Sequence, residues 1–149
     1  MNVKHDLHKA CLETISRKIQ HLQKVLADLK ESSANETKST AGDKHETALA
    51  MLQIEQVNVN AQLHQLLEQK AVLHKIDPGL DTICVVNGSL VQTNHAKFYI
   101  SVALGKITVD GEVVFCISIQ SPIGKKIAGR APGDTFELNN INYIIERLC

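Results

Sequence analysis

The sequence predicts an α+β protein in which an antiparallel helical hairpin precedes a small, mainly antiparallel β domain. Three observations support this fold class. Apolar residues recur in steps of three and four through the first half of the chain, and in steps of two beyond it. Between the halves, Pro78 and Gly79 interrupt any helix and favour a turn. We therefore expect a hairpin over residues 1–76 and a β domain over residues 77–149.

The first helix is expected over residues 5–38, which are rich in good helix formers. Its apolar seam alternates steps of three and four and consists of Leu12, Ile15, Ile19, Leu22, Leu26 and Leu29. The polar stretch 31–40 either continues this helix or frays. Gly42 is a natural place for the helix to stop.

The return helix is expected from Asp43 to about Lys75. Gln56 and Lys70 interrupt its seam, which otherwise consists of Leu49, Leu52, Val59, Leu63, Leu66 and Leu73. Two such seams joined by a turn predict an antiparallel coiled coil with its tip near residues 42–46. At 1.5 Å per residue each arm would be about 45–50 Å long, so the hairpin is expected to project.

The second half of the chain alternates apolar and polar residues as half-buried strands do. Strands are expected over 82–87, 89–94, 97–104, 107–109, 112–120, 135–138 and 141–148. Asn87-Gly88 and Asp110-Gly111 are hairpin-turn signals, and Asn139-Asn140 tolerates the left-handed conformation of a tight turn. A short helical turn fits at 124–128. A domain of about 70 residues is small but can bury a core.

Composition and charge exclude some functions. A net charge of zero argues against an autonomous DNA or RNA binder, and 3% aromatic residues with no Trp leave little surface for base stacking. Residues 1–30 carry six Lys or Arg against three acids, and residues 31–46 carry four acids against two Lys. Ordinary solvated helix faces would account for this uneven distribution of charge. A basic stem that ends in an acidic tip would account for it equally. The basic face would consist of Lys4, Lys9, Arg17, Lys18 and Lys24.

The four cysteines, Cys11, Cys84, Cys116 and Cys149, are widely spaced and show no zinc-ligand pattern. Cys84 and Cys116 lie in apolar strand runs and are expected to fill the core. The chain starts with a polar segment, and no apolar run reaches the length of a membrane span. We expect a reduced, cytoplasmic protein that does not contact a membrane.

Asp43 and Glu46 form the most informative pair at the predicted tip. Asp-x-x-Glu at a helix start is typical of a capping box, and both carboxylates suit the positive end of the helix dipole. Two carboxylates are also enough to recruit Mg²⁺, which prefers oxygen ligands and keeps several waters. A carboxylate can cap the free helix and still bind a metal ion once docked, so both interpretations stand. His45 lies between the acids and is expected to be an exposed helix residue.

The segment 119–134 resembles the C-terminal signature of the bacterial Gre transcript-cleavage factors. The matching residues are Ser121, Pro122, Ile123, Gly124, Gly129, Gly133 and Asp134. The predicted tip is similar to the Gly-Asp-x-x-Glu element that these factors carry between their coiled-coil helices, here Gly42, Asp43 and Glu46. The resemblance covers the whole chain in order, from the hairpin through the Pro/Gly linker to the β domain.

The resemblance implies a β domain folded like an FKBP prolyl isomerase and a monomer that binds RNA polymerase. The hairpin would enter the secondary channel and stimulate cleavage of backtracked RNA at its 3′ end, reaching RNA and DNA only indirectly. Asp43 would bind a second Mg²⁺ and Glu46 would support the metal or orient the attacking water. The chain would hold no cofactor stably and would not be an enzyme by itself. Polymerase docking would use a loop of Ser121, Pro122, Ile123 and Gly124, although Pro and Gly also simply shape a corner there.

Three alternatives follow from the residues. The acidic and aromatic residues that Gre factors carry after the second tip carboxylate are absent here, where Ala48, Leu49 and Ala50 follow Thr47. A Gre-like protein that blocks the channel or inhibits transcription without promoting cleavage is therefore the second hypothesis. A stand-alone enzyme would need a Cys-His pair or a prolyl isomerase pocket, and the sequence favours neither. A plain coiled-coil module would self-associate through the seam.

Overall fold

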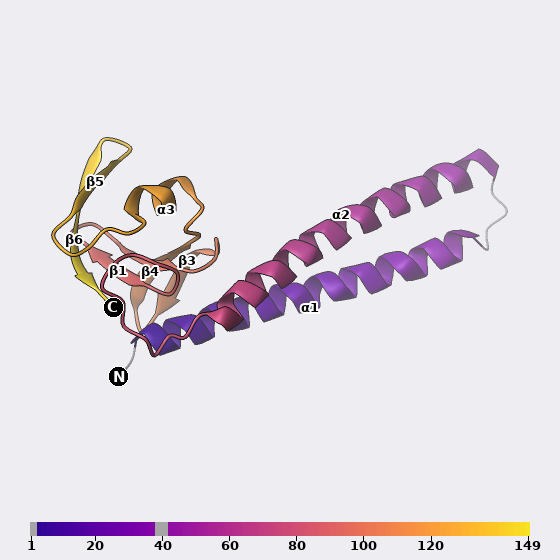
Figure 1. Cartoon of the computed structure of the whole chain (residues 1–149). Coiled ribbons are helices and arrows are strands. Elements are labelled where there is room, and N and C mark those ends of the chain that lie inside the picture. The colour runs from indigo at the N-terminus through magenta and orange to yellow at the C-terminus, as the bar shows by residue number, and fades with distance from the viewer. Residues whose placement is uncertain (1–2, 38–41) are drawn as a thin grey trace. The chain divides into compact units, whose positions relative to one another are not determined.

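The computed structural model describes residues 3–37 and 42–149, and the side chains of residues 3–35 and 46–149. The chain divides into two compact units. One is Thr14–Lys70, and the other joins Met1–Glu13 to Ala71–Cys149. The sequence placed the whole of 1–76 in one unit, whereas the contacts group both ends of that segment with the β domain. The fold class is confirmed: a helical hairpin with a small, mostly antiparallel six-stranded β domain (Figure 1).

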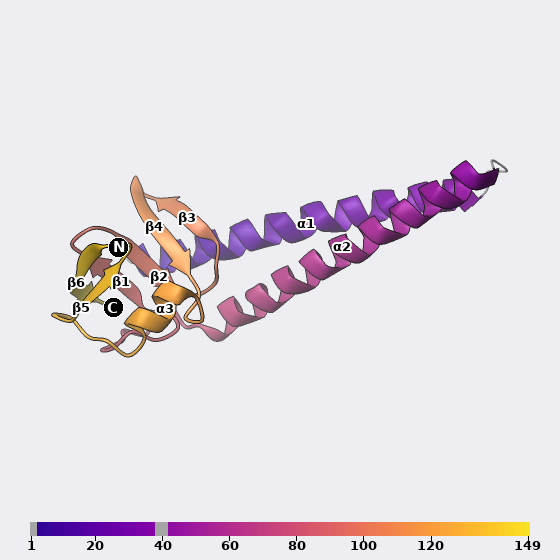
Figure 2. The same ribbon diagram turned by 90° about the horizontal axis from the view of Figure 1, so that it is seen from above.

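Two long helices, α1 (Val3–Thr37) and α2 (Gly42–Lys75), make up the hairpin. They agree closely with the expected bounds. Figures 1 and 2 show each of them as one long, continuous helix. None of the described helices is long and apolar enough to cross a membrane.

The predicted seam is less exposed than the rest of the helices within the unit Thr14–Lys70. On α1, Ile15, Ile19 and Leu29 are buried. On α2, every seam position of this unit from Leu49 to Lys70 is half-buried while most residues between them are exposed. Gln56, the polar interruption, donates from Nε2 to the Ser33 hydroxyl at 2.7 Å. Gln56, which interrupts the apolar seam, thus makes a specific contact between the two helices.

The β unit contains six strands and one short helix. The strands are β1 (Leu90–Thr93), β2 (Lys97–Ile100), β3 (Gly105–Val109), β4 (Glu112–Ile117), β5 (Thr135–Leu138) and β6 (Ile141–Leu148). Their order in the sheet is β3-β4-β2-β1-β6-β5. All neighbours are antiparallel except β2 and β4, which pair in parallel with Tyr99 opposite Cys116. Strands β2 and β4 are both shorter than the strands that were expected over 97–104 and 112–120.

Two of the predicted turns have the required backbone. Asp110 and Gly111 have φ of 51° and 78°, and Asn139 and Asn140 have φ of 50° and 64°. These are the left-handed values of a two-residue hairpin turn. They join β3 to β4 and β5 to β6, as expected.

The expected strand over 82–87 is wrong. This segment is an irregular loop that contacts the turn after the short helix: the Val85 amide donates to the Arg130 carbonyl at 2.8 Å, and Gly129 donates to Val85 at 2.8 Å. The Val86 amide donates to the Ser89 hydroxyl at 3.0 Å instead of to a strand. These contacts satisfy the backbone groups of Val85 and Val86, so the segment 82–87 does not need to pair with a strand. Cys84 is accordingly a half-buried loop residue and not a core residue, whereas Cys116 is buried as predicted.

The sheet buries side chains on both faces because residues alternate along each strand. Phe98 and Ile100 of β2 join the main core, whose other buried members are Val85, Val91, Ile127, Phe136 and Ile145. Tyr99, between them, points to the opposite face, where it contacts the first turns of α1. Leu7 and Leu73 are fully buried in the same unit. The similarity of this β domain to an FKBP prolyl isomerase stays a prediction.

Candidate functional site

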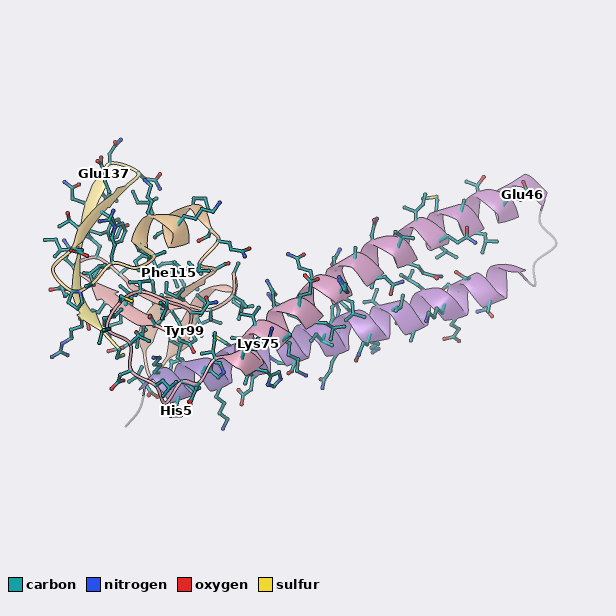
Figure 3. The ribbon with its side chains drawn as sticks, in the orientation of Figure 1. His5, Glu46, Lys75, Tyr99, Phe115 and Glu137 are labelled. Carbon is teal, nitrogen blue, oxygen red and sulfur yellow. The ribbon has the colours of Figure 1, made fainter. Side chains whose placement is uncertain are left out.

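The two candidate tip carboxylates belong to the first turns of α2, which begins at Gly42. Glu46 is exposed, and Figure 3 shows it at the N-terminal end of this helix. The side chain of Asp43 lies outside the described side chains, as does that of His45. The capping and metal-binding roles of the pair therefore stay predictions.

The start of a helix favours a carboxylate. The first four amides of a helix have no intrahelical acceptor, and they give the N-terminus a partial positive charge. An exposed carboxylate there is stabilised without being enclosed. It keeps its oxygens accessible to a cation supplied by another molecule.

The Ser121 corner begins the short helix α3 (Pro122–Ile127), two residues earlier than the predicted 124–128. Ser121 is the N-cap: its hydroxyl accepts from the Gly124 amide at 3.0 Å and donates to the Ser118 carbonyl at 2.6 Å. Pro122 occupies the first helical position, where its missing N–H costs nothing. The Ser-Pro sequence is thus a helix start.

Gly124 is required by packing. A Cβ atom at this position would lie 2.1 Å from the Ser118 carbonyl oxygen and 2.8 Å from the Ile119 backbone. Ile123 packs against the main core. All four candidate docking residues therefore have structural roles, and of the four only Pro122 is exposed, beside exposed Lys125. Docking through this corner stays a prediction.

The rest of the 119–134 signature is also explained by turns. Gly129 and Gly133 have φ of 76° and 94°, which other residues rarely adopt. The Asp134 carboxylate accepts from the Ala131 amide at 2.8 Å. The turns on either side of α3 therefore account for the spacing of these residues.

A buried polar cluster joins the start of α1 to the sheet, and no motif of the sequence predicted it. The His8 ring Nδ1 lies 2.7 Å from the Tyr99 hydroxyl, and the sulfurs of Cys11 and Cys116 are 3.4 Å apart. Burial lowers the pKa of His8, opposed by a hydrogen bond at the Leu73 backbone. Burial, together with the nearby cysteines, raises the pKa of Tyr99. The only usable signal was that His8 and Cys11 lie one helical turn apart.

Lys4 does not belong to the suggested basic face. Its side chain is buried and its ammonium group donates to the Leu80 carbonyl at 2.7 Å. Burial lowers the pKa of Lys4, although Cys149, Asp81 and Asp77 counteract this effect. Lys4 therefore ties the start of α1 to the linker after α2.

Among the residues whose side chains are described, no group of three or more His, Cys, Asp or Glu residues is placed to hold a metal ion. Asp43 is not among these residues, so the finding does not concern the tip pair. Carboxylate oxygens remain suitable ligands for Mg²⁺ by their chemistry.

No protein-family model matches the chain, and no curated protein matches it. Among solved structures, one described as that of the transcription factor Gfh1 is similar, with 16% sequence identity and a TM-score of 0.38. The similarity covers 94% of this chain and 94% of the Gfh1 chain.

Proposed function

We propose that the chain is a Gre-type transcription factor that binds RNA polymerase and stimulates cleavage of backtracked RNA. One observation carries the proposal: Asp43 and Glu46 belong to the first turns of the second hairpin helix, in a chain that also has the 119–134 signature. In the resembling family the same two elements occur in the same order.

The hairpin suits the delivery of a carboxylate. Helix α2 has 34 residues, or about 50 Å at 1.5 Å per residue, so residues near its start are remote from those near its end. Paired helices are stiff, and a stiff arm positions its end group at a lower entropic cost than a loop. Glu46 is exposed and can meet a partner without rearrangement of the hairpin.

Under this proposal the polymerase supplies the active site and the first Mg²⁺. A second Mg²⁺ held by Asp43 would stabilise the charge that develops on the phosphodiester during hydrolysis. Glu46 would support the metal or hold the attacking water in line with the scissile bond. The chain would not be an enzyme alone, because the substrate and the other metal ion belong to the polymerase.

An assay on a stalled, backtracked elongation complex of the cognate polymerase tests the proposal. We expect the wild-type protein to accelerate release of the RNA 3′ fragment in Mg²⁺, and both Asp43→Ala and Glu46→Ala to lose this effect. Glu55→Ala is the matched control, because Glu55 is an exposed acid on the same helix and should leave cleavage unchanged.

Binding to the polymerase must be measured in parallel with cleavage. Loss of cleavage with unchanged binding in the two tip variants supports delivery of the carboxylates. Binding of the wild type without any effect on cleavage would favour the inhibitory regulator, which Ala48, Leu49 and Ala50 after the tip suggest. If the wild type does not bind polymerase, both functions are excluded.

A further inference from the structure

Two cysteines that are far apart in sequence meet inside the β unit. Cys11 of α1 and Cys116 of β4 are 105 residues apart, yet their sulfurs are separated by 3.4 Å. Both are free thiols and both are fully buried. The fold brings them together because Cys116 lies beside Tyr99 in the parallel register of β2 and β4, while His8 and Cys11 lie one turn apart on α1.

The neighbouring contact holds the two thiols in place. The His8 ring contacts the Tyr99 hydroxyl at 2.7 Å, so two adjacent residues of the sheet face two residues of one helix face. Hydrogen bonding from the Cys116 thiol lowers the pKa of Cys11, while the same contact raises that of Cys116. Cys11 is therefore the thiol that more readily becomes the nucleophilic thiolate.

We propose that Cys11 and Cys116 are an oxidation site at which hydrogen peroxide forms a reversible disulfide between α1 and β4. The Cys11 thiolate attacks one oxygen of hydrogen peroxide and breaks the O–O bond, which leaves a sulfenic acid on Cys11 and a hydroxide ion. The hydroxide takes up the proton that Cys11 released and becomes the first water. The Cys116 sulfur then attacks the Cys11 sulfur and displaces a second water. Two thiols lose two electrons and two protons, and hydrogen peroxide is reduced to two waters.

The geometry requires a small movement only. A disulfide has a sulfur–sulfur distance of about 2.05 Å, so the two sulfur atoms must approach by about 1.4 Å. Because both thiols are buried, the oxidant reaches them when the first turns of α1 separate transiently from the sheet, as helix ends do. Oxidation is then expected to be slower than for an exposed thiol, and to follow local opening.

The bond would lock the start of α1 onto the sheet. It would close a loop containing most of α1, all of α2 and the first three strands, and a cross-link over so long a segment restricts the unfolded chain strongly. A dithiol reductant would restore the two thiols by exchange. The oxidised and reduced forms would therefore differ in stability and in opening of the hairpin base.

The test uses the full chain without polymerase, so its result is independent of the proposed function. The variant Cys84→Ser/Cys149→Ser keeps only the proposed pair and changes no fully buried residue. Reduced protein is treated with hydrogen peroxide, unfolded in N-ethylmaleimide and weighed by mass spectrometry. We expect loss of two hydrogen atoms, no labelled thiol and a linked peptide pair containing Cys11 and Cys116. The melting temperature should rise by about 5–15 °C, and dithiothreitol should reverse it.

Any of three results would overturn the proposal. In the first, the variant keeps both thiols labelled under conditions that oxidise the half-buried cysteines of the wild type. In the second, Cys11 accumulates as sulfinic acid, and in the third, the wild type links other cysteine pairs. Cys116→Ala, checked for native circular dichroism, should abolish the linked peptides and the shift in melting temperature.

Discussion

Among the glycines that the structure describes with their surroundings, Gly124 is the one whose neighbours leave the least room for a side chain. In Gly124→Ala the new methyl group would overlap the Ser118 carbonyl oxygen, which lies 2.1 Å from the Cβ position. Since the opposing atoms are backbone, we expect a loss of about 3 kcal/mol in the free energy of unfolding. Urea titration followed by tyrosine fluorescence measures this, because the chain has no Trp and both tyrosines, Tyr99 and Tyr143, lie in the β unit.

The Ser121 cap provides a graded comparison at the same corner. Ser121→Ala removes one hydrogen bond to the Gly124 amide and should cost about 1 kcal/mol. Lys125→Ala, at an exposed position of α3, should change stability by less than about 0.5 kcal/mol. An equal effect of all three substitutions would contradict the packing argument.

His8 should make the stability of the β unit depend on pH. Burial lowers its folded-state pKa below the unfolded value of 6.5, so the unfolded chain binds a proton that the folded chain does not. The contribution of neutral His8 to the free energy of unfolding is complete above pH 6.5. It is lost as the pH falls from 6.5 toward the folded-state pKa of His8. Around the ring, His5 and His74 oppose protonation, Asp77 favours it, and Tyr99 contributes a neutral hydroxyl.

The substitution His8→Gln should reduce the slope of the free energy of unfolding against pH, by at most about 1.4 kcal/mol per pH unit. The measurement compares the urea midpoints of wild type and His8→Gln, followed by tyrosine fluorescence at several pH values between 5 and 8. A variant with the wild-type slope would show that other groups cause the acid sensitivity.

At the scale of elements, Gln56 shows how the hairpin combines stability with register. Its amide reaches Ser33 on the opposite helix at 2.7 Å, from a seam position that is otherwise apolar. Polar residues at such positions fix register at a cost in stability. Gln56→Leu should therefore raise the stability of the hairpin by about 1 kcal/mol, because a half-buried apolar side chain replaces an amide.

Circular dichroism of the helices during thermal unfolding measures the effect of Gln56→Leu. Gln53→Leu is the matched control, since Gln53 is an exposed residue on the same helix and should give no such gain. A fall in stability for Gln56→Leu would mean that the contact with Ser33 contributes more than the apolar seam.

The elements differ in how far their sequence determines them. The helices and the turns at Asp110 and Asn139 were predictable because the deciding contacts are local, either a heptad seam or a left-handed backbone position. The 82–87 segment has the composition of a strand, but its partners are Arg130 and Ser89. The meeting of Cys11 with Cys116 depends on the parallel pairing of β2 with β4, which no local pattern encodes. The tip pair was identified by motif alone, and its geometry depends on Asp43, whose side chain is not described.

At the scale of the whole molecule, the proposed function depends on the length of the hairpin. Gln56 donates both to the Leu29 carbonyl at 3.4 Å and to the Ser33 hydroxyl at 2.7 Å, so it lies opposite the middle of 29–33. In an antiparallel pair this register places residues 22–28 opposite residues 59–65. Deleting both segments removes one heptad from each helix, preserves the seam and shortens both arms by about 10 Å. The β unit and the tip residues remain unchanged.

The shortened protein should still compete with the wild type for binding to the polymerase if the proposed docking residues Ser121–Gly124, which are unchanged, make that contact. It should nevertheless lose stimulation of RNA cleavage, because its carboxylates would end about 10 Å short of the reacting phosphate. Circular dichroism must first show a folded hairpin, and deletion of 59–65 alone, which breaks the pairing, serves as the misfolded reference. Full cleavage activity in the double deletion would show that the tip carboxylates are not delivered by the hairpin at a fixed reach.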